Sequence, residues 1–322
     1  MPRLRTTGVN TTPHSSTSYS ARNPHDRATI GFSRVVVPTP LGDVVVHVNP
    51  NAAAHSETAT LLLHGAAGSW TTWLPLIRAA HNAHEPLQNV VALDLPGWGD
   101  SGSLASGATV EDMVDAVAHV ATTLGFADWH TIGHSLGAHL ALTLAARYPE
   151  CTRSVTAISA TGPTALAVLR HPIRNFGTLP LLAGMLGAMR FLAALGRAGG
   201  TLIRTLHRLR LLGPLSSPLF TSRSTLDDSV IDSLAAEIRP LAFVRASAAA
   251  ARYDEQAWSS IRCPVTLIRG ERDVFVSARD DLWFANELPH ATQQSTEHAG
   301  HFAHIETVGL APRSRAGVHV AA

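Results

Sequence analysis

A serine between two glycines, at a predicted strand-to-helix junction, constrains the fold of this chain more than any other feature. Residues 129–132 form a short apolar run, Gly133-His134-Ser135-Leu136-Gly137 follows, and an Ala/Leu-rich helical stretch begins directly behind it. Gly133 and Gly137 lack Cβ atoms, so the strand and the helix can approach closely enough to force a sharp turn. Such a turn exposes the hydroxyl of Ser135 just ahead of a helix N-terminus. A glycine-rich connector without chemistry is the competing interpretation of these five residues.

The composition is that of a globular protein without a strong overall charge. The chain has 322 residues, of which 45% are hydrophobic and 15% charged, and its formal net charge is +1. This length allows one large α/β domain or two ordinary ones, and the composition excludes a wholly disordered chain. A net charge so close to zero provides no general attraction for nucleic acid or acidic lipid, and we expect no nucleic-acid partner.

The cysteines and the first residues predict a cytoplasmic protein. Cys151 and Cys263 are far apart and lack metal-ligand spacing, as expected of incidental thiols in a reducing compartment. Residues 1–30 are rich in Ser, Thr and Arg and contain no apolar segment of a secretory signal. We expect a disordered tail there, with an organelle transit peptide as the alternative. No stretch reaches the roughly 18 consecutive apolar residues of a membrane span.

Short apolar runs alternate with helical stretches over most of the chain. Such runs are typical of strands buried on both faces of a parallel sheet, and their alternation with helices predicts a mostly parallel, doubly wound α/β fold. The first two runs flank residues 39–43 and predict a hairpin. Thr109, with Asp112 three positions on, predicts the start of a helix that runs to Leu124. The predicted strands include residues 35–37, 44–48, 60–63, 90–93, 129–132, 155–158 and 264–268.

The alternation stops between about residues 162 and 252. Leu, Ala, Gly and Arg dominate there, and residues 164–251 hold ten arginines and four acids. We therefore predict a helical cap at 164–251, inserted between a first core part at 31–163 and a second at 252–322. Residues 201–212 have the pattern of a basic amphipathic helix. It is interpreted either as a helix on a membrane surface or, preferably, as a cap helix over an apolar pocket with its arginines in water.

An activated serine needs a base, an orienting acid and donors for an oxyanion. Open α/β sheets place such groups in the loops that follow the carboxyl ends of their strands. Asp273 follows the predicted strand at 264–268, with Glu271 as the alternative acid. His301 is the predicted base, with His298 as the alternative. The sequence thus predicts Ser135 as nucleophile, His301 as general base and Asp273 as the acid that orients it.

The loop that follows the predicted strand at 60–63 supplies the remaining donor. The backbone N–H of Ala66 and that of Leu136 are expected to bind the same oxyanion. We expect His64 to support this loop rather than to react. Five further residues are predicted to shape or support the site: Gly65, Gly133, His134, Gly137 and Asp100.

No cofactor or metal is predicted. His298, His301 and His304 fall within seven residues, but no cysteine or acidic residue shares the spacing of known zinc sites. The glycines at 65 and 68 lack the G-x-G-x-x-G spacing of a dinucleotide-binding loop.

On these motifs the chain resembles the α/β-hydrolase superfamily, in the branch with a helical cap. The order Ser135, Asp273, His301 is the chain order of its catalytic triad. The resemblance covers about residues 31 to 306, the cap by position only. The resembling segments are His64-Gly65-Ala66-Ala67-Gly68-Ser69-Trp70, Asp94-Leu95-Pro96-Gly97-Trp98-Gly99-Asp100-Ser101, Gly133 to Gly137, Gly270 to Asp273, and Gly300-His301-Phe302. The second of these shapes a loop beside the site, in which Asp100 is expected to be structural.

The C-terminal end departs from this family. After His301 the family usually ends in an amphipathic helix packed on the sheet. Here residues 305–310 are short, Pro312 interrupts them, and residues 313–317 are mostly polar. We therefore expect the loop that bears His301 to be less well supported than usual.

The resemblance implies a serine hydrolase that cleaves a carboxylic ester through an acyl-enzyme. The apolar stretches at 181–195 and 201–212 fit a lipophilic small-molecule substrate. A serine at the nucleophile position disfavours the branches that dehalogenate or open epoxides, since those use an aspartate there. Hydrolysis of carbon–carbon bonds in ring-fission products stays open, as does perhydrolase or acyltransferase chemistry. A non-catalytic ligand receptor on the same fold is the alternative from another class.

Overall fold

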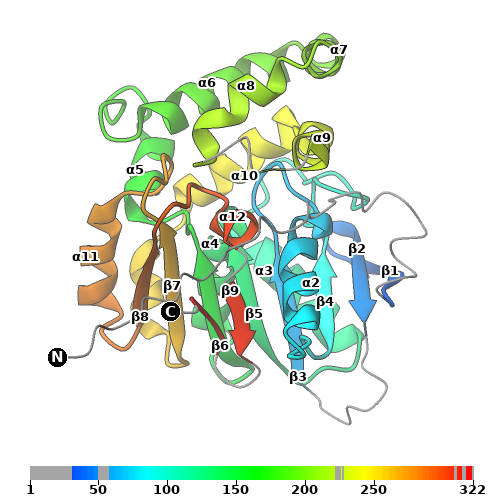
Figure 1. Cartoon of the computed structure of the whole chain (residues 1–322), viewed down its shortest axis with the longest axis vertical. Helices are drawn as coiled ribbons and strands as arrows, with labels where there is room; N and C mark the ends of the chain where they lie inside the picture. Colours follow the sequence, from blue (N-terminus) through cyan, green and yellow to red (C-terminus); the bar gives the residue numbers. More distant parts are fainter. Residues whose placement is uncertain are drawn as a thin grey trace, which may run out of the picture.

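An eight-stranded sheet forms the centre of the molecule (Figure 1). This computed structural model describes residues 31–49, 58–221, 226, 228–307, 310–313 and 317–320, the last two ranges by their backbone alone. The tail predicted for residues 1–30 lies outside these ranges. The strands are β1 (Ser33–Thr39), β2 (Gly42–Asn49), β3 (Thr58–Leu63), β4 (Val90–Leu93), β5 (Asp128–His134), β6 (Thr152–Ile158), β7 (Val265–Gly270) and β8 (Thr292–Thr296).

The sheet has the order β1-β2-β4-β3-β5-β6-β7-β8 and is mostly parallel. The predicted hairpin is confirmed, because β1 and β2 pair antiparallel with Thr39 opposite Gly42. β2 is also antiparallel to β4, and every pair from β4 to β8 is parallel. The carboxyl ends of β3, β5, β6 and β7 therefore lie at one edge of the sheet, where their loops can share a site.

Helices cover both faces of the sheet, as the doubly wound prediction requires. Helices that flank the sheet are α2 (Leu74–Asn82), α3 (Val110–Thr123), α4 (Leu136–Arg147), α11 (Ala278–Glu287) and α12 (Ala303–Glu306), with the 3₁₀ turns η1 (Trp70–Trp73) and η4 (Glu255–Ser260). Between β6 and β7 lie α5 (Pro163–Arg170), α6 (Pro180–Ala194), α7 (Arg197–Arg208), α8 (Leu212–Ser216), η2 (Ser217–Leu219), α9 (Asp228–Glu237) and α10 (Pro240–Arg252).

The alternation of side chains along β3 shows how the two faces are filled. Leu61 and Leu63 point to a core shared with α3, α4 and α11, which α5 and α10 also join. Leu62 points to the other face, where it packs with residues of η1, α2 and α12. All three leucines are fully buried. Because both faces of this central strand are buried, its sequence is an uninterrupted apolar run.

The predicted helix after Thr109 is confirmed together with its cap. The Thr109 side chain accepts the N–H of Asp112 at 3.1 Å, and the Asp112 carboxylate accepts the N–H of Thr109 at 2.9 Å. This reciprocal pair satisfies two backbone donors that the first turn of a helix leaves without partners.

The prediction of one helix over residues 201–212 is wrong. Helix α7 ends at Arg208, Arg210 has a positive φ of 57°, and α8 begins at Leu212. The break lets Ile203 and Leu212 both reach an apolar cluster with Ala235 of α9. Tertiary packing thus outweighs the modest cost of one left-handed residue.

The chain after His301 contains no long helix in the part that the structure describes. Helix α12 spans four residues, and β9 (Leu310–Arg313) then pairs antiparallel with β10 (Gly317–Val320). None of the described helices has both the length and the apolar character needed to cross a membrane.

Candidate active site

Ser135 occupies a strained turn between β5 and α4. Its φ is 53° and its ψ −115°, outside the regions that non-glycine residues favour. The strain is sustained by hydrogen bonds on both sides of the residue. The N–H of Ser135 donates to the Ile158 carbonyl at 2.9 Å, and its carbonyl accepts the N–H groups of Ala138 and His139 at 3.1 Å each. The backbone is therefore fixed while the side chain stays accessible.

The two glycines of the motif are required by close backbone contacts. A Cβ at Gly133 would lie 2.2 Å from the carbonyl oxygen of Gly137. A Cβ at Gly137 would lie 2.0 Å from the carbonyl oxygen of Leu63 on β3. Both distances are far below any real contact, so the turn needs glycine at each position for close approach.

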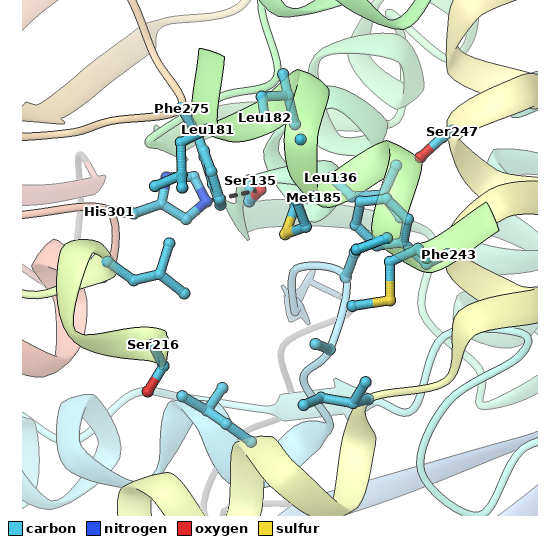
Figure 2. A pocket seen from close by; sticks show the side chains of 18 of the residues that line it. Ser135, Leu136, Leu181, Leu182, Met185, Ser216, Phe243, Ser247, Phe275 and His301 are labelled. Atoms are coloured by element: carbon cyan, nitrogen blue, oxygen red, sulfur yellow. Dashed lines mark hydrogen bonds between the residues drawn. The ribbon is translucent and has the colours of Figure 1, made fainter. Parts of the chain in front are cut away.

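The structure brings Ser135, His301 and Asp273 together from loops that follow three different strands. The Nε2 atom of His301 lies 3.0 Å from the Ser135 hydroxyl (Figure 2). Its Nδ1 atom lies 3.0 Å from each carboxylate oxygen of Asp273. These are the nucleophile–base and base–orienter distances at which a serine hydroxyl can be deprotonated.

Asp273 is held as a carboxylate. Burial alone would raise its pKa, but the nearby His301 and hydrogen bonds from His301 and the Phe275 N–H leave the pKa below its usual value. The Phe275 and Val276 N–H groups donate to its Oδ1 atom at 2.8 and 3.1 Å. A carboxylate can only accept, so His301 carries its proton on Nδ1 and presents Nε2 as a base to Ser135.

The alternative residues lie outside this arrangement. Glu271 is exposed, and its backbone N–H donates to Thr296. His298 is exposed and has a positive φ of 59°. His304 is fully buried on the other side of the loop, against Trp73 and His134. The three clustered histidines thus diverge, and among the described residues no group of three or more His, Cys, Asp or Glu side chains could hold a metal ion.

The loop that bears His301 is supported by the segment between β6 and β7 and by β5, contrary to the expectation of weak support. The His301 N–H donates to the Leu219 carbonyl of η2 at 2.9 Å. The carboxylate of Glu306 accepts the N–H of Gly300 at 2.7 Å and that of Thr221 at 2.5 Å. These bonds fix the loop that bears His301 at the backbone of Gly300 and His301 and tie it to the backbone of Thr221.

His134, the last residue of β5, fixes the same loop from the sheet. Its Nε2–H donates to the His301 carbonyl at 2.9 Å. Burial, with the nearby His304 and His301, holds the pKa of His134 well below its usual value, so the ring is neutral. His134 is thus placed to position the backbone of His301.

His64 holds the loop that carries Ala66. Its Nδ1–H donates to the Gly65 carbonyl at 2.7 Å, and its Nε2 accepts the Leu95 N–H at 2.9 Å. Burial lowers the pKa of His64, which suits a neutral ring with one donor and one acceptor. His64 therefore ties this loop to the one after β4 and does not face Ser135.

The Ala66 loop is a tight turn packed against the nucleophile. The Gly65 carbonyl accepts the Gly68 N–H at 3.0 Å, so the Ala66 N–H is not used by the turn bond. A Cβ at Gly65 would lie 3.0 Å from the Cβ of Ser135. Leu136 is the first residue of α4, where a backbone N–H has no intrahelical acceptor. Ala66 and Leu136 both line the cavity beside Ser135.

Sequence reasoning singled out Asp100 in the loop after β4, but Asp94 is the buried carboxylate there. Asp94 accepts the Trp70 N–H at 2.9 Å and the Asp100 N–H at 3.0 Å, and His47 lies 3.8 Å away. The Asp100 side chain is about half exposed and lies 3.4 Å from Arg34. Asp94 stands directly behind the predicted strand at 90–93, and that position was the signal available to find it.

Two further residues anchor this loop to the helical segment between β6 and β7. Glu237, which is buried, accepts the Gly99 N–H at 3.0 Å. Arg239 donates to the carbonyls of Gly99 at 2.5 Å and Gly97 at 3.3 Å. No spacing in the sequence relates these residues, because about 140 positions separate them.

Ser135 and His301 open into a cavity of about 460 Å³. Figure 2 shows Leu182, Met185, Phe243 and Phe275 around it, with Ser216 on the far side from Ser135. Leu, Ala, Met, Ile and Phe make up most of the lining, and Thr161, Ser216 and Ser247 are its other polar residues. No Arg, Asp or Glu is among the described residues that line it.

The buried His304 predicts a pH dependence of stability. Burial, and to a lesser extent His301, lowers its pKa to about 3, whereas the unfolded chain protonates near 6.5. The unfolded state therefore binds the extra proton first, and the free energy of unfolding falls as the pH drops below 6.5. In a His304→Leu variant the free energy of unfolding should depend less steeply on pH. The slope should fall by roughly 1.4 kcal/mol per pH unit, which corresponds to the uptake of about one proton fewer on unfolding. Urea denaturation between pH 6 and pH 4.5 measures this.

His290→Leu is the matched control, because His290 is exposed. Its slope should equal that of the unaltered protein. A His304→Leu protein with an unchanged slope would contradict the argument.

Comparison with known proteins identifies the family of the fold. A family model described as alpha/beta hydrolase fold matches residues 59–308. Over 274 residues the chain is 25% identical to a 2-hydroxy-6-oxononadienedioate/2-hydroxy-6-oxononatrienedioate hydrolase of Burkholderia vietnamiensis, covering 81% of this chain and 86% of that protein. Matches to the next curated relatives cover between 26% and 38% of those proteins.

Solved structures show the same fold at lower identity. A carboxylesterase of Bacillus subtilis aligns with a TM-score of 0.60 at 17% identity, covering 88% of this chain and 90% of that one. An epoxide hydrolase aligns with a TM-score of 0.64 at 20% identity, covering 85% and 94%. The family model spans most of the sequence and agrees with the sheet order and the serine turn, and the chain thus belongs to the alpha/beta hydrolase fold family.

Proposed function

We propose that this hydrolase cleaves carboxylic esters of lipophilic, uncharged small molecules with Ser135 as nucleophile. The observation that carries the proposal is the hydrogen-bonded series Ser135–His301–Asp273, which opens into an apolar cavity. A largely apolar pocket with a few placed polar groups is the usual form of a site for such molecules.

The reaction follows from the positions of these side chains. His301 Nε2 takes the proton of Ser135 as its Oγ attacks the ester carbonyl carbon, and Asp273 stabilises the imidazolium. The N–H groups of Ala66 and Leu136 are proposed to bind the oxyanion, and loss of one such donor typically lowers turnover about 10²- to 10³-fold. His301 then protonates the leaving alcohol. Water, activated by His301, attacks the acyl-enzyme, which releases the acid and restores Ser135.

The lining of the cavity supports an uncharged substrate. A carboxylate taken into an apolar cavity without a cationic partner loses its hydration and gains nothing in return. The relative from Burkholderia vietnamiensis is named for a substrate with two carboxylates. Ester hydrolysis is therefore the first candidate. Carbon–carbon bond hydrolysis is the second, and the similarity to that relative supports it.

A pair of esters of equal length tests the substrate class. We expect kcat/KM for p-nitrophenyl hexanoate to exceed that for the p-nitrophenyl monoester of adipic acid by roughly 100-fold, since an unpaired buried charge costs at least about 2 to 3 kcal/mol. The measurement is initial-rate kinetics at neutral pH. Equal values for the two esters would contradict a lipophilic, uncharged substrate.

A variant with a cationic side chain in the cavity provides the complementary test of the substrate class. Met185 lines the cavity from α6, and Met185→Arg should narrow the difference between the two esters by providing the missing partner. A ring-fission dienoate assayed beside both esters separates the two candidate reactions. Faster turnover of the dienoate than of either ester would favour carbon–carbon bond hydrolysis.

We propose further that residues 164–251 act as a cap over the cavity. Helices α6, α8 and α9 contribute Leu182, Leu215 and Leu234 to its lining. Ser135 itself lies on the core side, at the end of β5. The cap then selects the substrate while the core carries the chemistry.

A further inference from the structure

Exposed apolar side chains gather on the outer layer of the helices between β6 and β7. Helices α6, α7 and α8 lie farthest from the sheet (Figure 1). We call these three helices, with the residues from 173 that lead into them, the outer face. Of twelve large hydrophobic residues that are exposed in the described parts of the chain, nine belong to it. They are Ile173, Phe176, Leu181, Phe191, Leu195, Leu202, Leu209, Leu211 and Leu215.

These side chains are not needed to hold the helices in place. Ile203 and Leu206 of α7 and Leu212 of α8 already pack inward against Ala235 of α9. Leu209 and Leu215, in contrast, are 62% and 66% exposed. A contiguous surface on which many large apolar side chains remain exposed, in addition to those that pack inward, is typical of an interaction site.

The outer face carries positive charge only. Six arginines lie on it, and the sequence has no acidic residue between Glu150 and Asp227. Three of them, at 197, 204 and 208, share one stripe of α7, because residues seven and four apart lie on the same side of a helix. Within the described residues none of the six is within ion-pair distance of a carboxylate. The six are Arg174, Arg190, Arg197, Arg204, Arg208 and Arg210.

The cavity of the active site reaches the surface within the same face. Leu181, Gly184 and Ala188 of α6 are exposed and also line the cavity, as does Leu215 of α8. Leu181 and His301 both line this cavity (Figure 2). A molecule that enters between α6 and α8 thus passes from the apolar outer face to Ser135.

We propose that the outer face docks on an anionic lipid surface and that the cavity is filled from it. Apolar side chains enter the acyl region while guanidinium groups pair with lipid phosphates, as in amphipathic helices that lie on membranes. A second copy of the chain suits this face less well, because it would set arginines against arginines. The filling of the cavity rests on the proposed function, whereas the docking does not.

Vesicle binding tests the docking without any turnover. The full-length Ser135→Ala protein is mixed with phosphatidylcholine vesicles that contain or lack phosphatidylglycerol, and bound protein is measured by flotation at low and high salt. We expect binding to the phosphatidylglycerol vesicles that falls as salt rises. Absence of binding at low salt would overturn the proposal.

Two matched pairs of variants locate the contact. Arg204→Glu should weaken vesicle binding at least about fivefold, since each arginine near such a surface contributes on the order of 1 kcal/mol. Arg262→Glu, just before β7 at the opposite end of the sheet, changes the net charge equally and should leave binding unaltered. Leu209→Ser should weaken binding about tenfold, and Leu282→Ser on α11, which is also exposed, should not.

Sedimentation velocity and soluble-ester kinetics complete the test. A dimer that Leu209→Ser dissociates would overturn the proposal, because the face would then be covered by a second copy. Arg204→Glu and Leu209→Ser should keep their kcat on p-nitrophenyl hexanoate, since neither residue lines the cavity. Vesicle binding without esterase activity would refute the proposed function alone, and esterase activity without vesicle binding would refute the docking alone.

Discussion

Replacing Ser135 with alanine is expected to lower kcat for p-nitrophenyl hexanoate by at least about 10⁴-fold, as loss of the nucleophile does in serine hydrolases with such a triad. The variant keeps the turn, because the backbone bonds of Ser135 do not involve its hydroxyl. It loses the hydroxyl that lies 3.0 Å from His301 Nε2 and that His301 is expected to deprotonate. Steady-state kinetics measure the loss, and a circular dichroism spectrum verifies the fold.

The two sequence alternatives provide matched controls for the other triad members. His301→Asn and Asp273→Asn should each lower kcat about 10³- to 10⁴-fold, because the base or its tautomer is lost. His298→Asn and Glu271→Gln make comparable changes within three residues, at exposed positions, and should leave kcat within about twofold. Equal losses in a member and its control would show that the loop, rather than the side chain, is required.

A fluorophosphonate probe separates the enzyme from a ligand receptor on the same fold. Such a probe labels a serine only where a base activates it. We expect labelling of the unaltered protein and none of Ser135→Ala. A protein that is neither labelled nor active on any ester would favour the receptor.

The second large effect concerns the fold, and we expect Gly137→Ala to destabilise the protein by at least about 3 kcal/mol, at the upper end of the range for overpacked cores. The new Cβ would lie 2.0 Å from the Leu63 carbonyl oxygen and 2.6 Å from that of His64. Both atoms belong to the backbone of β3 and its loop, so no side-chain rotation relieves the overlap. Urea denaturation followed by tryptophan fluorescence measures the change.

Gly187 offers the matched control for this substitution. It lies in α6, and a Cβ there would have no heavy atom within 4 Å. Gly187→Ala should therefore be neutral or stabilise the protein by about 0.5 to 1 kcal/mol, since alanine restricts the unfolded chain. A Gly137→Ala protein as stable as Gly187→Ala would show that α4 can shift away from β3 at little cost.

Local sequence signals were sufficient for the sheet and for the three residues that meet at its edge. The serine turn needs glycine at two fixed positions, and buried parallel strands need unbroken apolar runs, so both features are visible in short windows. Asp273 and His301 were found because loops after strands of one sheet must converge.

Contacts of the segment between β6 and β7 could not be predicted from short stretches of sequence. Glu306 meets Thr221, and Glu237 meets Gly99, only after the chain has folded back over 85 and 138 residues. The break at Arg210 has the same origin, because Leu212 turns inward to a cluster that α9 completes. The apolar residues keep a helical spacing through Arg210 in the sequence, but tertiary packing breaks the helix there.

The hydrogen bond from the His301 N–H to the Leu219 carbonyl couples the position of His301 to that of η2. Backbone N–H···O hydrogen bonds have lengths of about 2.7 to 3.2 Å, so a displacement of η2 by about 1 Å away from His301 would break this bond. Glu306, which bridges Thr221 and Gly300, would be pulled in the same direction. The position of the His301 ring therefore depends on residues 219–221 as well as on the loop that carries it.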